Sequence, residues 1–328
     1  MLIEWSVDCN NDGIVDLGQI LNGQLTDSNG DGVPDVCQGI VTVPGNFATI
    51  QAAIDSTPNG ASRIINVAAG SYAGPIDFKG KNVVVRGAGA GATILAGTGG
   101  ATRAVVNMAG EPSTAALERV TVQWGYTGTP FPGTPSALCG GGIQFYGGQN
   151  KVIDTVVQNN NCTSVGGGIA LVGGLQQIIR TSVRDNTAGL GAGAVWWTAV
   201  GQSAQSPAFL TLTDSVLTGN RTTSGPDGGM QLLADQPNTF VSLTDTQVCG
   251  NLPRPNISGR WSDLGGNTVC ECIGDVSGDG QVNGADIGVL LSAWGPCGIT
   301  CPGDLNHDGM INGFDLGLML ANWGPCAP

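Results

Sequence analysis

One short pattern occurs four times between residues 139 and 251, and this repeat restricts the possible folds more than any other feature. Each copy alternates apolar and polar residues and ends in asparagine: IDTVVQNN (153–160), IRTSVRDN (179–186), TDSVLTGN (213–220) and TDTQVCGN (244–251). A weaker copy, LERVTVQW, stands at 117–124. Period-two alternation predicts strands. Glycine-rich turns (CGGGI, VGGGI, LGAGA and DGGM) separate the copies, whose asparagines are 26, 34 and 31 residues apart. This combination predicts the coils of a solenoid.

The asparagines that end the copies form a column: Asn160, Asn186, Asn220 and Asn251. We expect them to stack at one bend, where a short amide side chain tolerates a left-handed backbone and bonds to the coils above and below. This predicts a structural ladder rather than a catalytic set.

The spacing of the repeats resembles the right-handed parallel β-helix of the pectate lyase-like superfamily. The segment from 49 to 95, which opens with TIQAAIDSTPNG, is similar to the N-terminal cap and first coils of that family. Phe47, Ile50, Ala53 and Ile54 have helical spacing and predict a short helix over the first coil. The resemblance covers about residues 40 to 270 and implies the fold more strongly than any activity.

We therefore expect a mainly β chain in three parts. Residues 1–39 form an acidic calcium-loop segment, residues 40–270 a right-handed parallel β-helix, and residues 271–328 an α-helical module of paired calcium loops.

The charge balance narrows the choice of partners. Twelve basic and 25 acidic residues give a formal charge of −13, which argues against nucleic acid and anionic membranes and favours cations. No run of eighteen apolar residues is present, so no membrane span is predicted.

The chain has ten cysteines, an even number that favours disulfides in an oxidising, extracellular compartment. Cys9 and Cys37 bracket the N-terminal segment, Cys139 and Cys162 lie about one coil apart, and Cys249 precedes Cys270. The remaining four are Cys272, Cys297, Cys301 and Cys326, and the connectivity stays open.

Two acidic loops lie nineteen residues apart near the N-terminus. Their predicted ligands are Asp8, Asn10, Asp12, the Ile14 carbonyl and Asp16 in the first, and Asp27, Asn29, Asp31, the Val33 carbonyl and Asp35 in the second. Oxygen ligands at alternate positions suit calcium. Gln19 and Gln38 stand where an EF-hand loop has its final acidic ligand. The alternative is a solvated turn rich in Asp, Asn and Gly. The segment resembles thrombospondin type 3-like calcium repeats.

Residues 271–326 consist of two halves offset by 29 residues, each with a complete twelve-residue calcium loop. The predicted ligands at positions 1, 3, 5, 7, 9 and 12 are Asp275, Ser277, Asp279, the Gln281 carbonyl, Asn283 and Asp286, and then Asp304, Asn306, Asp308, the Met310 carbonyl, Asn312 and Asp315. Gly280 and Gly309 occupy position 6, where the loop turns sharply. Calcium is therefore the predicted cofactor.

This unit resembles a type I dockerin, a resemblance that implies a cohesin-like partner. Two features depart from that family: the helices end early at Trp-Gly-Pro-Cys, and positions 10 and 11 hold Gly284, Ala285, Gly313 and Phe314 in place of hydroxyl pairs.

A second column could be catalytic or structural: Asp154, Arg180, Asp214 and Asp245 stand at equivalent positions of successive coils. Pectate lyase-like enzymes use several carboxylates with a basic residue, whereas an alternating ladder of surface charges is worth little per pair. We predict no catalytic residue here. Trp196 and Trp197 could form a sugar platform or a buried patch.

Three functions stay open. The first is a secreted, non-catalytic calcium-binding protein that assembles head to tail with copies of itself into an extracellular fibre. The second is a secreted polysaccharide lyase or hydrolase with a docking module. The third is a carbohydrate-binding surface adhesin.

Overall fold

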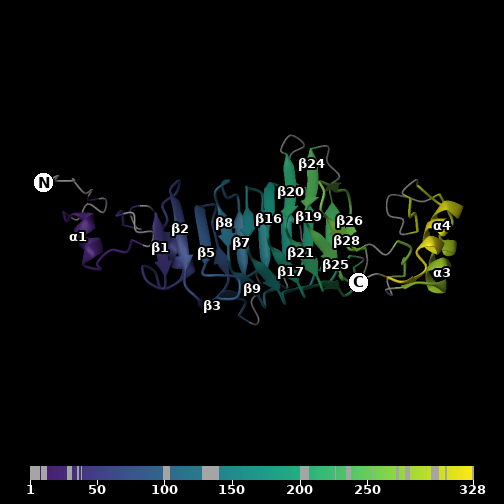
Figure 1. The fold of residues 1–328 in the computed structure, drawn as a ribbon, viewed down its shortest axis with the longest axis horizontal. Coiled ribbons are helices and arrows are strands. Elements are labelled where there is room, and N and C mark those ends of the chain that lie inside the picture. Colours follow the sequence, from purple (N-terminus) through teal and green to yellow (C-terminus); the bar gives the residue numbers. More distant parts are fainter. Residues whose placement is uncertain are drawn as a thin grey trace.

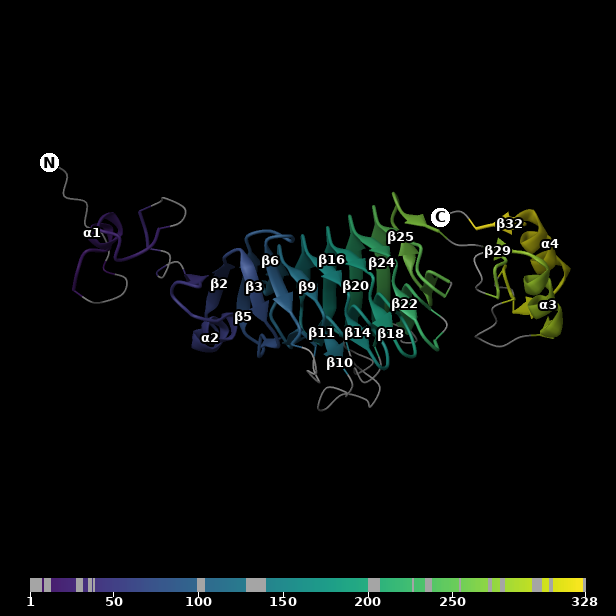
Figure 2. The same cartoon turned by 90° about the horizontal axis from the view of Figure 1, so that it is seen from below.

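The computed structural model describes residues 8, 13–27, 32–34, 37, 39–98, 104–127, 140–199, 207–225, 227–233, 238–253, 255–270, 273–277, 281–296, 303–306 and 309–326. Its central part is a right-handed parallel β-helix, as the repeats predict. Short parallel strands stack along the long axis of the molecule in successive coils (Figures 1 and 2). Among the described residues, no helix is long and apolar enough to cross a membrane.

Four parallel sheets run along the β-helix. The nine-stranded sheet contains β1 (Ile40–Val43), β2 (Ser62–Val67), β5 (Asn82–Gly87), β8 (Ala116–Glu118), β12 (Lys151–Ile153), β16 (Leu175–Ile179), β20 (Ala208–Thr213), β24 (Thr239–Thr244) and β27 (Ser262–Asp263). The eight-stranded sheet contains β3 (Gly70–Ala73), β6 (Thr93–Ala96), β9 (Thr121–Gln123), β13 (Val156–Gln158), β17 (Ser182–Arg184), β21 (Val216–Thr218), β25 (Gln247–Cys249) and β28 (Thr268–Val269).

The other two sheets complete each coil. The seven-stranded sheet contains β4 (Ile76–Asp77), β7 (Val106–Ala109), β11 (Ile143–Tyr146), β15 (Ile169–Val172), β19 (Val195–Thr198), β23 (Met230–Leu233) and β26 (Ile257–Ser258). The four-stranded sheet contains β10 (Tyr126–Thr127), β14 (Asn161–Cys162), β18 (Thr187–Ala188) and β22 (Arg221–Thr222).

Period-two alternation builds the core. In β20, Ala208, Leu210 and Leu212 are fully buried, while the residues between them are partly exposed. Each buried aliphatic side chain contributes about 1.5–3 kcal/mol relative to an exposed one. The same inward positions recur in every coil, so one continuous apolar core runs from Val41 to Ile257.

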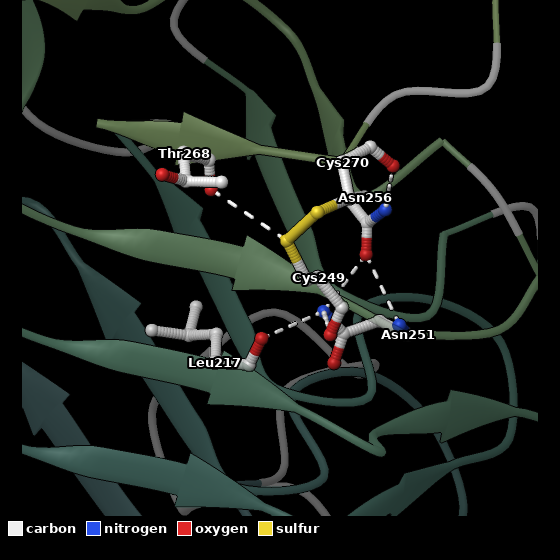
Figure 3. The surroundings of a disulfide bond; sticks show 6 residues. All are labelled: Leu217, Cys249, Asn251, Asn256, Thr268 and Cys270. Carbon is white, nitrogen blue, oxygen red and sulfur yellow. Dashed lines mark hydrogen bonds between the residues drawn. A yellow bond between two sulfur atoms is a disulfide. The ribbon is translucent and has the colours of Figure 1, made fainter. Parts of the chain in front are cut away.

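The predicted asparagine ladder is present and is one residue longer than the repeats indicate. The Asn160 side-chain amide donates to Asn186 Oδ1 at 2.9 Å, and Asn186 and Asn220 continue the series at 2.9 and 2.8 Å. Asn251 then donates to Asn256 Oδ1 at 2.9 Å (Figure 3). All five are buried, so the ladder satisfies polar groups that would otherwise be costly inside the protein.

The left-handed backbone at this bend is not at the ladder asparagines, contrary to expectation. It falls one residue earlier, at Asn159, Asp185, Gly219 and Gly250, with φ between 53° and 67°. These residue types adopt positive φ most readily. The ladder asparagine is therefore left free to bridge coils with its side chain.

Helix α2 (Ile50–Ser56) confirms the predicted cap over the first coil. Thr49 accepts a hydrogen bond from the Ala52 N–H at its N-terminus, and Ile50, Ala53 and Ile54 are buried. Lys81 Nζ donates to the carbonyls of Ile54, Asp55 and Thr57 at 2.7–2.9 Å, so it satisfies the C-terminal carbonyls of the helix.

Small elements lie beyond both ends of the β-helix (Figure 1). Helix α1 (Asp16–Leu21) stands at the N-terminal end, where the sequence predicts only loops. The C-terminal elements are β29 (Gln281–Val282), α3 (Gly284–Ser292), β30 (Gly295–Pro296), β31 (Met310–Ile311), α4 (Gly313–Ala321) and β32 (Gly324–Pro325).

Candidate metal centres

Three of the four predicted calcium loops share one hydrogen bond. Oδ2 of the position-1 aspartate accepts the backbone N–H of the position-6 glycine at 2.8 Å in each pair: Asp8 with Gly13, Asp27 with Gly32, and Asp304 with Gly309. The three glycines have φ of 84°, 82° and 86°. A Cβ would meet no atom within 4 Å at any of them, so the backbone conformation is what requires glycine. In the fourth loop, Gly280 lies outside the described residues.

The position-12 aspartates close the C-terminal loops. Asp286 accepts the backbone N–H groups of Ser277 and Asn283, both at 2.8 Å. Asp315 accepts those of Leu305 at 2.8 Å and Asn312 at 2.8 Å. Each aspartate therefore ties the start of its loop to the first turn of the helix that follows.

Hydrogen bonding decides the charge state of these two buried aspartates. Burial alone raises the pKa of a carboxyl group, but the backbone hydrogen bonds from Asn283 and Ser277 outweigh it and hold the pKa of Asp286 below its usual value. The same balance, with bonds from Asn312 and Leu305, lowers the pKa of Asp315. Both side chains are fully buried and ionised at neutral pH.

Each C-terminal helix starts with the same capping box. Asn283 accepts the Ala285 N–H and Asn312 accepts the Phe314 N–H, at 2.7 and 2.8 Å. The position-3 hydroxyl of Ser277 donates to Asp275 Oδ1 at 3.4 Å. Positions 1, 3, 9 and 12 of the first loop are thus brought together by the hydrogen bonds of Asp275, Ser277, Asn283 and Asp286.

These loops lie in parts of the chain with no basic side chain. Residues 261–328 hold eight acidic residues and no Lys or Arg, and so do residues 1–62. Residues 63–260 hold all twelve basic residues and nine acidic ones. The formal charges are therefore −8, +3 and −8 along the chain. A bound cation would offset the excess of negative charge in these two end segments.

The donor set fits a hard cation with oxygen ligands. It consists of carboxylates, amide and hydroxyl oxygens and backbone carbonyls, which suit calcium better than zinc. No three Asp, Glu, His or Cys side chains converge on one point among the described residues. Each C-terminal loop has three aspartates, and its position-5 aspartate, Asp279 or Asp308, lies outside the described residues. The predicted ligands Asn10, Asp12, Asn29, Asp31, Asp35, Asp279 and Asp308 lie outside the described part of the chain.

The N-terminal segment differs from the prediction in one respect. Asp16 begins helix α1 and is buried, and Gln19, at the place of the missing final ligand, is buried on the same helix. The first N-terminal loop therefore leads into a helix, as the C-terminal loops do.

The four charged residues of the predicted column lie at the same turn of successive coils, between the nine-stranded and eight-stranded sheets. Asp154, Arg180, Asp214 and Asp245 all have φ between 45° and 50°. Asp154 and Arg180 form a two-point ion pair, and the hydrogen bond from Arg180 lowers the pKa of Asp154. A carboxylate held ionised by a fully engaged arginine is poorly suited to proton transfer.

The outer face of the seven-stranded sheet carries a row of mostly polar side chains that the sequence pattern does not predict. In register across the sheet are Asp77, Asn107, Gln144, Ala170, Trp196, Gln231 and Ser258. Asn107 and Gln144 are buried, and Asn107 Oδ1 and Gln144 Nε2 find no hydrogen-bond partner in the described structure. Loops of unequal length separate these strands, so the sequence gives no fixed spacing that would have found the row.

Asp227 lies at one end of this row. Its Oδ2 accepts Gln231 Nε2 at 2.9 Å, and it is 2% exposed. Burial raises the pKa of Asp227 to about 6, while hydrogen bonds from Ser258 and Gln231 oppose the rise. Trp196 is buried on this outer face and Trp197 points into the core, so the two form no exposed platform.

A disulfide closes the last coil. Cys249 and Cys270 are bonded, as their order in the sequence suggests, and Asn256 Nδ2 donates to the Cys270 carbonyl at 2.7 Å (Figure 3). Cys37, Cys162 and Cys326 are also disulfide-bonded. Cys9, Cys139, Cys272, Cys297 and Cys301 lie outside the described residues.

The chain was compared with known families, curated proteins and solved structures. No protein-family model matches the chain, and no curated protein matches it. Among solved structures, it is similar to pectin methylesterase from carrot, with a TM-score of 0.41 and 15% identity over 73% of this chain and 66% of that one. It is also similar to pectate lyase Pel9A, with a TM-score of 0.41 and 13% identity over 68% and 67%. The chain thus spans slightly less than two thirds of the carrot protein.

Proposed function

We propose that this chain is a secreted calcium-binding protein whose β-helix carries a calcium-ordered module at each end. One observation carries the proposal: the position-1 aspartate accepts the position-6 glycine N–H at 2.8 Å in three separate loops. That bond sets the turn that aims alternate oxygen atoms at one cation.

Electrostatics supports the same proposal. Each end segment carries a formal charge of −8 with no basic residue to offset it. Four calcium ions, one for each predicted loop, would bring the whole chain from −13 to −5. Calcium would then relieve the repulsion among carboxylates that lie within one twelve-residue loop of the sequence.

Calcium titration of the full chain tests this proposal. Isothermal calorimetry is expected to show four ions per chain, two of them lost when Asp275 and Asp304 are both replaced by Ala. The control is Asn322→Ala, an exposed residue of the same module, which should bind as the unmodified chain does. Failure to bind calcium at millimolar concentration would refute the proposal.

The calcium modules also suggest how copies assemble, and we propose a head-to-tail extracellular fibre. The modules lie at opposite ends of an elongated β-helix, so each is available to a neighbouring copy (Figure 2). A heterologous contact that does not close on itself produces a filament. Light scattering in millimolar calcium should show growth that a chelator reverses. Growth that persists after deletion of residues 1–38 would contradict this arrangement.

A second candidate function is polysaccharide processing, favoured by the polar row on the seven-stranded sheet. The row combines amide side chains with a tryptophan and ends at a carboxyl group with a pKa of about 6, within the range useful for proton transfer. Its two ends, at Asp77 and Ser258, are partly exposed. The proteins named above include a pectate lyase and a pectin methylesterase, which makes uronic-acid polysaccharides the first substrates to test.

The test compares two aspartate variants on pectin and other uronans. If the row is catalytic, Asp227→Asn should abolish release of methanol, reducing ends or unsaturated products, while Asp214→Asn on an exposed turn should leave release unchanged. Absence of all three products from the unmodified protein would eliminate this candidate.

A further inference from the structure

In the described part of the C-terminal module, the strands of the two calcium loops pair with other segments and not with each other. The strand β29, which contains the position-7 residue Gln281, pairs with β32, at the end of the second repeat. The strand β31, which contains the position-7 residue Met310, pairs with β30, at the end of the first repeat. Both pairings are antiparallel. Each loop is therefore held by the Trp-Gly-Pro segment of the other repeat.

One apolar core lies beneath both loops. Val282 and Leu290 from the first repeat pack with Ile311 and Met319 from the second, and all four are fully buried. Gly274, next to the first ligand, is so close to the second repeat that a Cβ there would lie 3.0 Å from the Met319 Cα. The repeats thus form one unit, rather than the two self-contained halves that an internal repeat suggests.

A second contact holds the first loop at its position-1 ligand. The Cys326 sulfur lies 3.6 Å from Asp275 Oδ2, directly after β32. Cys326 is also disulfide-bonded, which restricts its movement beside this carboxylate. Residues 323–326 therefore meet the first loop at positions 1 and 7 without supplying a calcium ligand.

The N-terminal segment repeats part of this arrangement. The sulfur of Cys37, also disulfide-bonded, lies 3.9 Å from Asp16 Oδ2, at position 9 of its loop. Two modules of different sequence thus place a disulfide sulfur against a predicted calcium ligand. By contrast, the sulfur of Cys249 lies 3.7 Å from the Thr268 carbonyl, away from any predicted loop.

We infer that the Gly-Pro strand near the end of each C-terminal repeat (β30 and β32) positions the calcium loop of the other repeat, so the two loops bind calcium cooperatively. This rests on the proposed calcium binding. A loop whose ligands are already fixed loses less conformational freedom when the ion binds. The strand β30 belongs to the first repeat and pairs with the second loop, and β32 belongs to the second repeat and pairs with the first loop. Calcium that orders one repeat therefore also orders the strand that holds the loop of the other. The two binding free energies are then coupled.

The experiment is a calcium titration of the full chain with Asp8→Ala and Asp27→Ala, which silence the N-terminal loops. We expect two ions to bind with a Hill coefficient above one. Adding Asp304→Ala, which disables the second loop, should lower the affinity of the first loop at least tenfold, although none of its ligands has changed.

Two further variants test the clamp itself. Cys326→Ser and a chain ending at Asn322 retain every predicted calcium ligand. In each of them the first loop should bind calcium at least tenfold more weakly. The control replaces Cys249 and Cys270 together by Ser and should leave both affinities unchanged. Circular dichroism at saturating calcium checks that the Cys326→Ser chain keeps its helices, so that this variant carries the test if the shortened chain unfolds.

The outcomes separate the two proposals. If the chain with Asp8→Ala and Asp27→Ala binds no calcium, the proposed calcium binding by the C-terminal module is refuted. Two ions bound independently, with affinities unchanged by Asp304→Ala and Cys326→Ser, would overturn the clamp and leave calcium binding intact.

Discussion

Arg180 donates two hydrogen bonds to Asp154 of the preceding coil, with Nε 2.6 Å from Oδ1 and Nη2 2.9 Å from Oδ2. Both side chains stand on the exposed turn between the nine-stranded and eight-stranded sheets. The pair is about half exposed on either side, so solvent screens it and it contributes little to stability. The geometry describes a rung of a charge ladder rather than an acid–base pair.

Arg180→Ala should therefore change the stability little and any depolymerising activity not at all. Chemical denaturation should show a free energy of unfolding close to that of the unmodified chain. The matched control is Arg184→Ala, which breaks the exposed pair with Asp185. A hundredfold loss of pectin or uronan cleavage in Arg180→Ala alone would contradict this interpretation.

The asparagine ladder should be far more sensitive. Asn220→Ala removes three buried hydrogen bonds, to Asn251, to the Asn186 side-chain amide and to the Val183 carbonyl. We expect a loss of about 3 kcal/mol in the free energy of unfolding. Asn161→Ala is the control, because Asn161 is exposed, and it should stay within about 0.5 kcal/mol of the unmodified chain. Equal effects of the two changes would show that the ladder adds nothing to stability.

Burial of Asp227 should make the stability depend on pH. Its pKa is raised to about 6 in the folded chain, so the folded state binds its proton more tightly than the unfolded state does. The associated stability is fully present below about pH 4 and is lost as the pH rises through 6. Melting of the calcium-saturated chain between pH 4.5 and 7.5 should show this loss, and Asp227→Asn should remove it. Asp214→Asn should still show the loss of stability with rising pH. If Asp227→Asn also still shows it, the effect belongs to another group.

The disulfide between Cys249 and Cys270 should hold the last coil of the β-helix. It closes a segment with a sequence separation of 21, and replacing both residues by Ser should cost about 3 kcal/mol in the free energy of unfolding. Hydrogen exchange should then become faster in β28 than in β13, which lies in the middle of the stack. Unchanged exchange in β28 would show that Asn256 and the strand pairing close this end without the disulfide.

Much of the fold could be predicted because its signals are local and repeated. The alternation around Val157, Val183, Leu217 and Val248, with a closing asparagine, determines both the strand period and the bend. The left-handed residue was predicted one position too late, because Asn159 and Asp185 tolerate positive φ as well as the ladder asparagines do. Asn256 was missed as a ladder member because it stands in a coil that lacks the repeated motif.

The candidate sites were predictable only where their spacing is fixed. A calcium loop occupies twelve consecutive residues, so Asp304, Gly309 and Asp315 could be assigned roles from sequence alone. The pairing of Gln281 with Pro325 joins residues 44 positions apart through a two-residue strand, which leaves no periodic signal. The row that includes Asn107 and Gln144 depends on strand register across turns of variable length, and only the structure shows it.

Circular dichroism of the full chain during calcium removal tests the central claim most directly. The account predicts that chelation abolishes the helical signal of α3 and α4 while the β signal of the central β-helix persists, and that calcium restores the helices. In Asp304→Ala, restoration should require at least tenfold more calcium, whereas Asn322→Ala should behave as the unmodified chain. A helical signal that is the same with and without calcium, in a chain that binds none by calorimetry, would contradict the account.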